Sequence, residues 1–453
     1  MLRKLDNNIQ KMMCSVLNII WDFTKALDMR IREKFLTAFF MMISIMAYIY
    51  AILPIHVHLL LKCLIGTVFM LGILVFSIDR ELKPVKLNST ICLLWFGFGV
   101  IRLISGLIIS IEYLPLACIW LVGFPSIFFV WNNRKDYEKL FEHIYTAFLY
   151  PTIVFFVASI LLVPIRSSAY LGLTSNANAV GQRITAIFGL LIACFMFYGK
   201  GKKYVKILNL LCIWFSIAFA VYSRGRTITV VLASVIIAAF ICGAVIVKLS
   251  WYELLKKAVI LLIGGTVVTL IILPVNKVAT SIMPEVSFQE EKEQDANLNS
   301  LIDGYMVRME GNDKAKAGIN DYSSGRMGIW IEAISKSNML GHPSRNHIVT
   351  VRNGDVGNNT HNVFIQFMYD NGIIACVVFI LLVLVALKQT VLLCYNTRKR
   401  LYAILLMIEI SYLCISMFTS TNMPFLYEIS FVFYFVYAIL FEKSSGYTLH
   451  QAG

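Results

Sequence analysis

The sequence predicts an all-α polytopic membrane protein, and three observations lead to that fold class. The chain has 453 residues, of which 58% are hydrophobic and only 15% are charged. Its mean hydropathy is +0.74, more than a soluble protein of this length can keep out of water. Lys and Arg residues also gather in every second loop between the hydrophobic stretches, which is the pattern of loops that stay in the cytoplasm.

Twelve hydrophobic stretches have about the length that crosses a bilayer. They cover residues 35–53, 57–78, 89–111, 115–131, 144–164, 180–198, 205–222, 227–247, 256–273, 362–387, 402–420 and 425–441. The basic loops place both termini in the cytoplasm. They also place one long polar segment, residues 274–360, outside the cell between the ninth and tenth spans. The domains expected are therefore spans one to nine in 35–273, the outer loop, spans ten to twelve in 361–442, and a cytoplasmic tail in 443–453.

The first 34 residues are basic and amphipathic and do not have the pattern of a cleavable signal peptide, so they predict a helix lying on the cytoplasmic membrane surface. None of the ten cysteines lies in the long polar segment, which argues against a disulfide framework or a zinc site. The net charge of +14 comes mainly from loops on one side, so it does not indicate a nucleic-acid partner.

The sequence contains no nucleotide-binding motif, and no histidine pair has the spacing of metal ligands with a carboxylate nearby. We therefore expect no metal and no cofactor. Any energy for a reaction would then have to come from an activated substrate.

Residues 323–343 of the outer loop predict an amphipathic helix on the outer membrane surface. Their apolar residues fall at helical spacing: Met327, Trp330, Ile331 and Ile334. Arg326 would lie in the first turn, where a cation is slightly unfavourable for the helix dipole. A specific anionic partner for Arg326 is more plausible than simple solvation for that reason, although a solvated arginine is the alternative.

Arg224 and Arg226 lie in the short junction between the seventh and eighth spans, at membrane depth on the outer side. A guanidinium is always charged and can bind phosphate oxygens through two hydrogen bonds. The alternative is that these side chains reach lipid headgroups and water. The functional interpretation is favoured for Arg224, while the two interpretations are balanced for Arg226.

Three further polar residues lie in or near spans. Arg183 begins the sixth span and Asn178 lies in the preceding turn, where it could bind a sugar or turn the chain. Arg102 lies inside the third span, where an arginine has either a function or a structural ion partner that the sequence does not identify.

His361 and Asn362 stand where the polar segment ends and the tenth span begins, within residues 358–372. An imidazole is costly to keep dry and titrates close to neutral pH. This position makes His361 a candidate general base, with Asn362 beside it as a candidate substrate-binding residue.

These weak motifs occur in a particular order: residues 175–179 (SNANA), residues 223–225 (SRG), Gly325-Arg326 with Trp330, and His361-Asn362 with Gln366 and Gly372. In this order the sequence resembles the O-antigen ligase and polymerase (Wzy-like) family. It differs in having Ile228 where a Leu is common. The resemblance implies a GT-C-like membrane glycosyltransferase architecture and maps the functional positions of the family onto Arg224, Arg326 and His361.

The function that the resemblance implies is a bacterial polysaccharide polymerase in the cytoplasmic (inner) membrane. Glycan would pass from an undecaprenyl-diphosphate-linked oligosaccharide to a hydroxyl of an acceptor repeat unit, on the outer face and without a metal. The arginines would bind the diphosphate and His361 would act as general base, with Arg226, Arg183, Asn178 and Asn362 as substrate-binding residues. Membrane lipid and a chain-length regulator protein are the other partners implied. The alternatives are ligase-type transfer to a different acceptor, a polysaccharide transporter or flippase, and a cell-wall glycosyltransferase.

Overall fold

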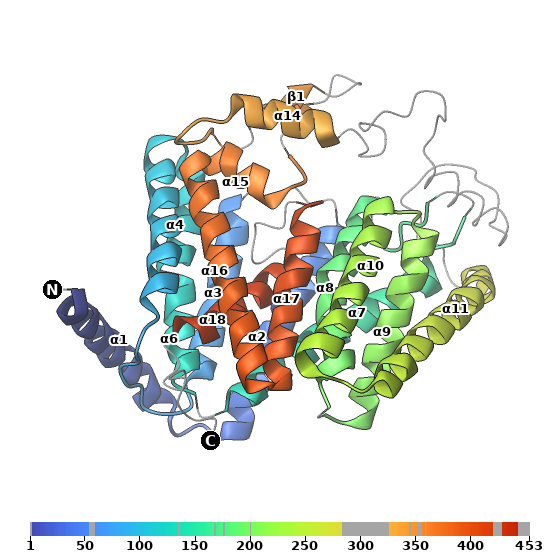
Figure 1. The fold of residues 1–453 in the computed structure, drawn as a ribbon, viewed down its shortest axis with the longest axis horizontal. Helices are drawn as coiled ribbons and strands as arrows, with labels where there is room; N and C mark the ends of the chain where they lie inside the picture. The colour runs from blue at the N-terminus through green and yellow to red at the C-terminus, as the bar shows by residue number, and fades with distance from the viewer. Residues whose placement is uncertain are drawn as a thin grey trace.

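A computed structural model describes residues 2–53, 59–134, 136–166, 169–174, 177–199, 201–282, 326–343, 346–350, 356–357, 359–419 and 428–442. The described chain forms a bundle of helices with a single two-stranded antiparallel sheet (Figure 1). The first half contains α1 (Leu2–Thr24), α2 (Met29–Ile52), α3 (Leu59–Ser77), α4 (Ser89–Ile108), η1 (Ile111–Tyr113), α5 (Leu114–Cys118), η2 (Ile119–Gly123), α6 (Phe124–Asn132), α7 (Tyr137–Leu162) and α8 (Ala177–Phe197). The second half contains α9 (Lys203–Tyr222), α10 (Arg226–Ile241), η3 (Cys242–Val247), α11 (Trp251–Ile282), α14 (Arg326–Lys336), β1 (Val349–Thr350), β2 (Val356–Gly357), α15 (Val363–Asn371), α16 (Ile373–Thr397), α17 (Arg400–Ser416) and α18 (Glu428–Phe441).

Among the described residues, nine helices are long and apolar enough to cross a membrane, which confirms the multi-pass class. One of them, Ile111–Asn132, is built from η1, α5, η2 and α6 in succession. The second, eleventh and twelfth predicted spans overlap α3, α17 and α18, which are not among these nine. The total of twelve spans and the GT-C-like architecture stay predictions.

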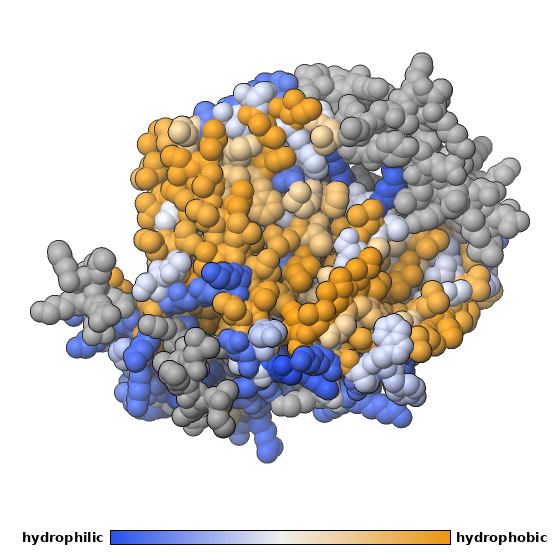
Figure 2. All heavy atoms as spheres, in the orientation of Figure 1, coloured by the Kyte–Doolittle hydropathy of each residue, from blue (hydrophilic) through white to orange (hydrophobic). Residues whose placement is uncertain are grey.

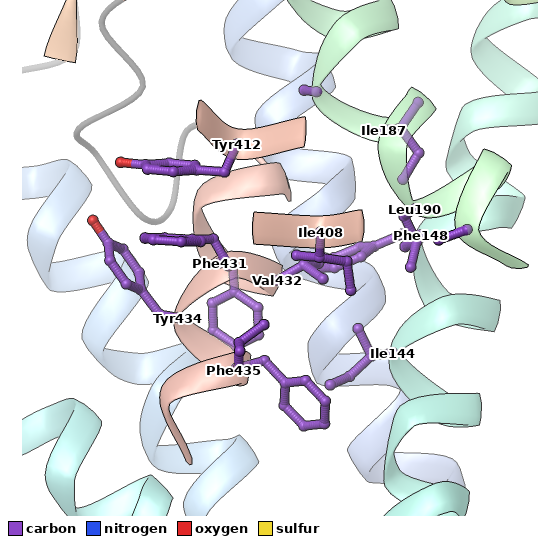
Figure 3. Close-up of a cluster of buried hydrophobic side chains, with 14 of the residues drawn as sticks. Ile144, Phe148, Ile187, Leu190, Ile408, Tyr412, Phe431, Val432, Tyr434 and Phe435 are labelled. Atoms are coloured by element: carbon purple, nitrogen blue, oxygen red, sulfur yellow. The ribbon is translucent and has the colours of Figure 1, made fainter. Parts of the chain in front are cut away.

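Aromatic residues fill much of the core. Figure 3 shows such a cluster, in which Tyr412 of α17 and Tyr434 of α18 lie among buried side chains from several helices. A second aromatic contact joins α4 to η2, where the Trp95 ring stacks on Trp120 with centroids 4.2 Å apart. Each indole N–H donates to the backbone oxygen of the other residue, at 2.9 and 3.1 Å. These paired bonds satisfy two polar groups that would otherwise be costly inside an apolar core.

Helix α1 and the last described residues lie at the same end of the bundle. Asn18 of α1 accepts a hydrogen bond from the backbone of Leu82, and Leu87 forms a β-bridge with Glu442. In Figure 2 the hydrophobic residues form a broad band, with hydrophilic residues gathered at this lower end. Exposed apolar side chains follow one face of α1: Ile9, Met12, Val16, Ile19 and Phe23. That stripe has the spacing of a helix that rests on a membrane surface.

Helix α11 extends beyond the predicted boundary at residue 273 and continues through Pro274 to Ile282. The buried side chain of Asn276 explains the extension. Its Nδ2 donates to the backbone oxygens of Ile160 and Val163 at the end of α7, and its Oδ1 accepts from the nitrogen of Ile165. These three bonds hold the last turns of α11 against α7.

The predicted tenth span is divided at Gly372 into a short helix, α15, and a long one, α16. Gly372 has φ 93° and ψ 164°, a conformation that is almost exclusive to glycine, and it turns the chain sharply. Helix α15 therefore lies beneath α14 near the end of the bundle instead of continuing the direction of α16 (Figure 1). His361 directly precedes this short helix.

Candidate functional site

The turn between α9 and α10 carries two of the predicted arginines. Ser223 is fully buried at the end of α9, Arg224 has a left-handed backbone with φ 52°, and Gly225 caps the helix that begins at Arg226. A positive φ is uncommon for a residue other than glycine and is found disproportionately at functional sites. Four such residues occur in the described chain, and the two outside helix C-caps are Arg224 and His361.

Helix α14 brings Arg326 to this turn. The Arg326 Nη1 donates to the hydroxyl of Thr227 in the first turn of α10, at 3.0 Å. Burial lowers the pKa of Arg326, and the positive charge of Arg226 lowers it further. Two guanidinium groups from remote parts of the chain therefore lie within electrostatic reach of each other. The helix predicted within residues 323–343 is present over Arg326–Lys336, with Arg326 as its first residue.

His361 lies within electrostatic reach of Arg326. Burial lowers the pKa of the His361 imidazole to about 4, and the charge of Arg326 is the second cause. The imidazole is therefore neutral at pH 7 and has a free lone pair that can accept a proton. Arg326 thus lies within electrostatic reach of both His361 and Arg226, and Arg224 lies two residues before Arg226 in the same turn.

Trp330 connects α14 to the turn that holds His361. Its indole Nε1 donates to the backbone oxygen of Thr360 at 2.7 Å. Further along α14, Ala333 is buried against Ile348 and Tyr369 of the neighbouring segments, whereas Ile331 and Ile334 remain exposed. The buried side of α14 therefore contains Ala333 and packs toward α15, whereas two of the residues predicted to form its apolar face are exposed.

Residues 338–342 and the α15–α16 elbow form a close contact that fixes α14 relative to His361; we call it the clasp. Ile373 N donates to the backbone oxygen of Asn338 at 2.9 Å. Gly341, with φ 96°, lies directly against the backbone of Asp370, and Gly372 lies against the backbone of Met339. Side chains complete the clasp, because Ser105 of α4 donates to the backbone oxygen of Leu340 and Tyr113 of η1 donates to that of His342.

Other predicted residues are placed differently. Arg183 is 5% exposed and its Nη1 donates to the backbone oxygen of Ala47 in α2, so at least part of its guanidinium joins two helices. The Asn362 side-chain oxygen caps α15 by accepting from Phe364 N and Ile365 N, and its Nδ2 donates to the oxygen of Met417. These contacts indicate structural roles for both side chains.

Asn178 lies in the first turn of α8, but its side chain falls outside the described residues. The structure therefore leaves its predicted contact with a sugar as a prediction.

Sequence reasoning missed Asp370, and it did not identify Asp370 and Thr360 as the hydrogen-bond partners of Gln366. The Gln366 Nε2 donates to Asp370 Oδ1 at 2.9 Å, and Gln366 Oε1 accepts from Thr360 N at 2.9 Å. Asp370 also interacts electrostatically with Arg102 of α4, whose partner the sequence did not identify. The signal that could have revealed this pair is an acidic residue four positions after a glutamine, on the same face of a helix.

The described fold and these contacts define a helical multi-pass membrane protein with a cationic site at one end of its bundle. Comparison with models of protein families and with curated proteins found no match to this chain.

Proposed function

We propose that the protein is a membrane glycosyltransferase that extends a polysaccharide from undecaprenyl-diphosphate-linked repeat units on the outer face of the bacterial cytoplasmic membrane. The observation that supports this most is the convergence of Arg226, Arg326 and His361 from three separate segments at one end of an apolar bundle. Guanidinium groups gathered in a partly desolvated place favour an anion with several oxygens, such as a diphosphate. The membrane setting favours a diphosphate carried on a lipid.

The chemistry follows from where charge develops. When the anomeric C–O bond breaks, negative charge builds on the departing diphosphate, and Arg326 with the arginines of the α9–α10 turn stabilises it electrostatically. At the same time His361 removes the proton from the acceptor hydroxyl as the new C–O bond forms. The proton stays on the imidazole until the diphosphate-linked lipid leaves.

The low pKa of His361 fits this cycle. With no anion bound, burial first and the charge of Arg326 second keep the imidazole neutral and make it a weak base. Binding of a diphosphate offsets that charge, so the pKa of His361 rises and the imidazole becomes a stronger base in the complex. Binding of the donor would thus remove the smaller of the two causes that lower the pKa and would strengthen the base to that extent.

The experiment is incubation of the purified protein with defined lipid-linked repeat units, followed by sizing of the glycan. A ladder of products supports a polymerase, and transfer only to a different added acceptor supports a ligase. Because an enzyme lengthens the glycan without any second compartment, glycan that stays at its original length with every acceptor would contradict the proposal and favour a transporter.

Three variants assign the site. We expect Arg224→Ala, Arg326→Ala and His361→Ala each to lower the extension rate by at least about 100-fold, the effect typical of losing a charge-stabilising or proton-transfer group. Lys277→Ala is the matched control, because Lys277 is an exposed cation in the last turns of α11. Normal extension by all three variants in folded protein would refute the site assignment.

A further inference from the structure

A series of buried hydrogen bonds leads from Asp370 to the residue before His361. Asp370 Oδ1 accepts from Gln366 Nε2, and Gln366 Oε1 accepts from the backbone N–H of Thr360, both at 2.9 Å. Gln366 is 7% exposed and Thr360 is fully buried, so water competes little for these bonds. One amide side chain thus connects the Asp370 carboxyl group on α15 to the backbone N–H of Thr360, the residue before His361.

Thr360 is also held from its other sides. Its carbonyl oxygen accepts from Trp330 Nε1 at 2.7 Å, and its hydroxyl donates to the oxygen of Asn362 at 2.8 Å. The His361 N–H donates in turn to Asn359 Oδ1 at 2.8 Å. Because the chain is fixed on both sides of His361, this residue can be held at φ 52°, a conformation that is unfavourable for a residue other than glycine.

Asp370 interacts with a buried arginine of the bundle. The neighbouring Arg102 of α4 is 3% exposed, and its guanidinium lies over the rings of Phe98 and Phe367, 5.6 and 5.4 Å from their centroids. Arg102 and Asp370 attract each other electrostatically. The hydrogen-bonded series therefore begins at Asp370, near the buried Arg102 of α4, and ends at Thr360, the residue before His361.

We infer that Gln366 and Asp370 are positioning residues that hold the His361 imidazole toward Arg326 through the Thr360 peptide. Neither side chain needs to touch the substrate. The inference about activity rests on the proposed function, whereas the inference about where His361 is held does not.

The test compares Gln366→Met, which removes both bonds of the amide at similar volume, with Asp370→Asn, which keeps an oxygen that accepts from Gln366. One readout needs no substrate: the rate at which diethyl pyrocarbonate modifies His361 at pH 7, resolved by mass spectrometry of the peptide. We expect this rate to rise at least about fivefold in Gln366→Met as the imidazole gains exposure, and to stay within about twofold in Asp370→Asn.

The second readout is chain extension. We expect Gln366→Met to lower kcat by on the order of 100-fold with little change in KM, since a misplacement of about 1 Å has that effect on a reacting group. Asp370→Asn should retain most of the rate. If Gln366→Met does not fold, Trp330→Phe provides a milder change, because it removes only the bond to the Thr360 oxygen and should raise the modification rate of His361 severalfold.

A rate of His361 modification in folded Gln366→Met equal to that of the wild type would overturn the inference. If Gln366→Met does not fold, the same result in Trp330→Phe would overturn it. A rise in the modification rate in Asp370→Asn equal to that in Gln366→Met would overturn it as well, because the acceptor oxygen that the substitution retains would then have no effect. Absence of chain extension by the wild-type protein would refute the proposed function alone, and the modification rates would still decide whether His361 is positioned in this way.

Discussion

Replacing Gly372 by alanine should release α14 from the clasp while leaving the rest of the bundle folded. A Cβ at this position would overlap the backbone carbonyl of Met339 and would lie 2.8 Å from the nitrogen of Leu340. The φ of 93° is unfavourable for alanine even without that overlap. Since the obstructing atoms belong to the backbone, relief requires the loop and the α15–α16 elbow to separate.

The magnitude has two parts. A residue other than glycine in this backbone region costs of order 1–3 kcal/mol, and forcing an extra methyl group into a packed contact costs about 1–3 kcal/mol. Together they destabilise the clasp by about 2–6 kcal/mol. Because 1.4 kcal/mol corresponds to tenfold in an equilibrium constant, local opening of α14 should increase at least about thirtyfold.

Hydrogen–deuterium exchange of the α14 amides, Arg326–Lys336, measures this opening directly. Gly201→Ala is the matched control, because Gly201 also has a positive φ, 103°, but its Cβ would meet only the Tyr198 ring, at 3.4 Å. We expect faster exchange in α14 and unchanged exchange in α7 for Gly372→Ala, and unchanged exchange in both helices for Gly201→Ala. Exchange of α14 equal in the two variants would refute the clasp as the contact that holds this helix.

Three other predictions follow from single contacts. Because folding lowers the pKa of His361 from 6.5 to about 4, the unfolded chain binds more protons between these pH values. The corresponding free energy of unfolding, about 3 kcal/mol, is present above pH 6.5 and is lost as the pH falls to 4. The melting temperature of His361→Asn should therefore depend less on pH in that window than that of the wild type, and an identical dependence would contradict the shift. Gly189→Ala should cost about 1–3 kcal/mol because its Cβ would overlap the Ser411 side chain, and the added substitution Ser411→Gly should restore most of the melting temperature; an equally unstable double variant would disprove the contact. Asn276→Ala should speed amide exchange in the last turns of α11, since it leaves three buried backbone groups without their side-chain partner, whereas exchange there as slow as in the wild type would show that α11 is held otherwise.

Much of the fold could be predicted because membrane insertion depends on composition and length. Long apolar stretches separated by basic loops predict spanning helices whatever their neighbours are, and nine such helices are present in the described part of the chain. The helix that begins at Arg326 was predictable in the same way from its periodicity. The boundaries at 273 and 372 were less accessible, because the buried contacts of Asn276 and the backbone turn at Gly372 depend on segments distant in the chain.

The sequence by itself determined the membrane class, the helical content and the residue types that a diphosphate site would need: Arg224, Arg326 and His361. Only the tertiary structure decided which of these residues meet. Arg326 reaches Thr227 and influences His361, whereas the guanidinium of Arg183 is directed at the backbone of α2. The physical reason is that hydropathy acts locally along the chain, while the direction of a side chain depends on buried hydrogen bonds and backbone contacts between remote segments, such as those of Gln366 and Gly372.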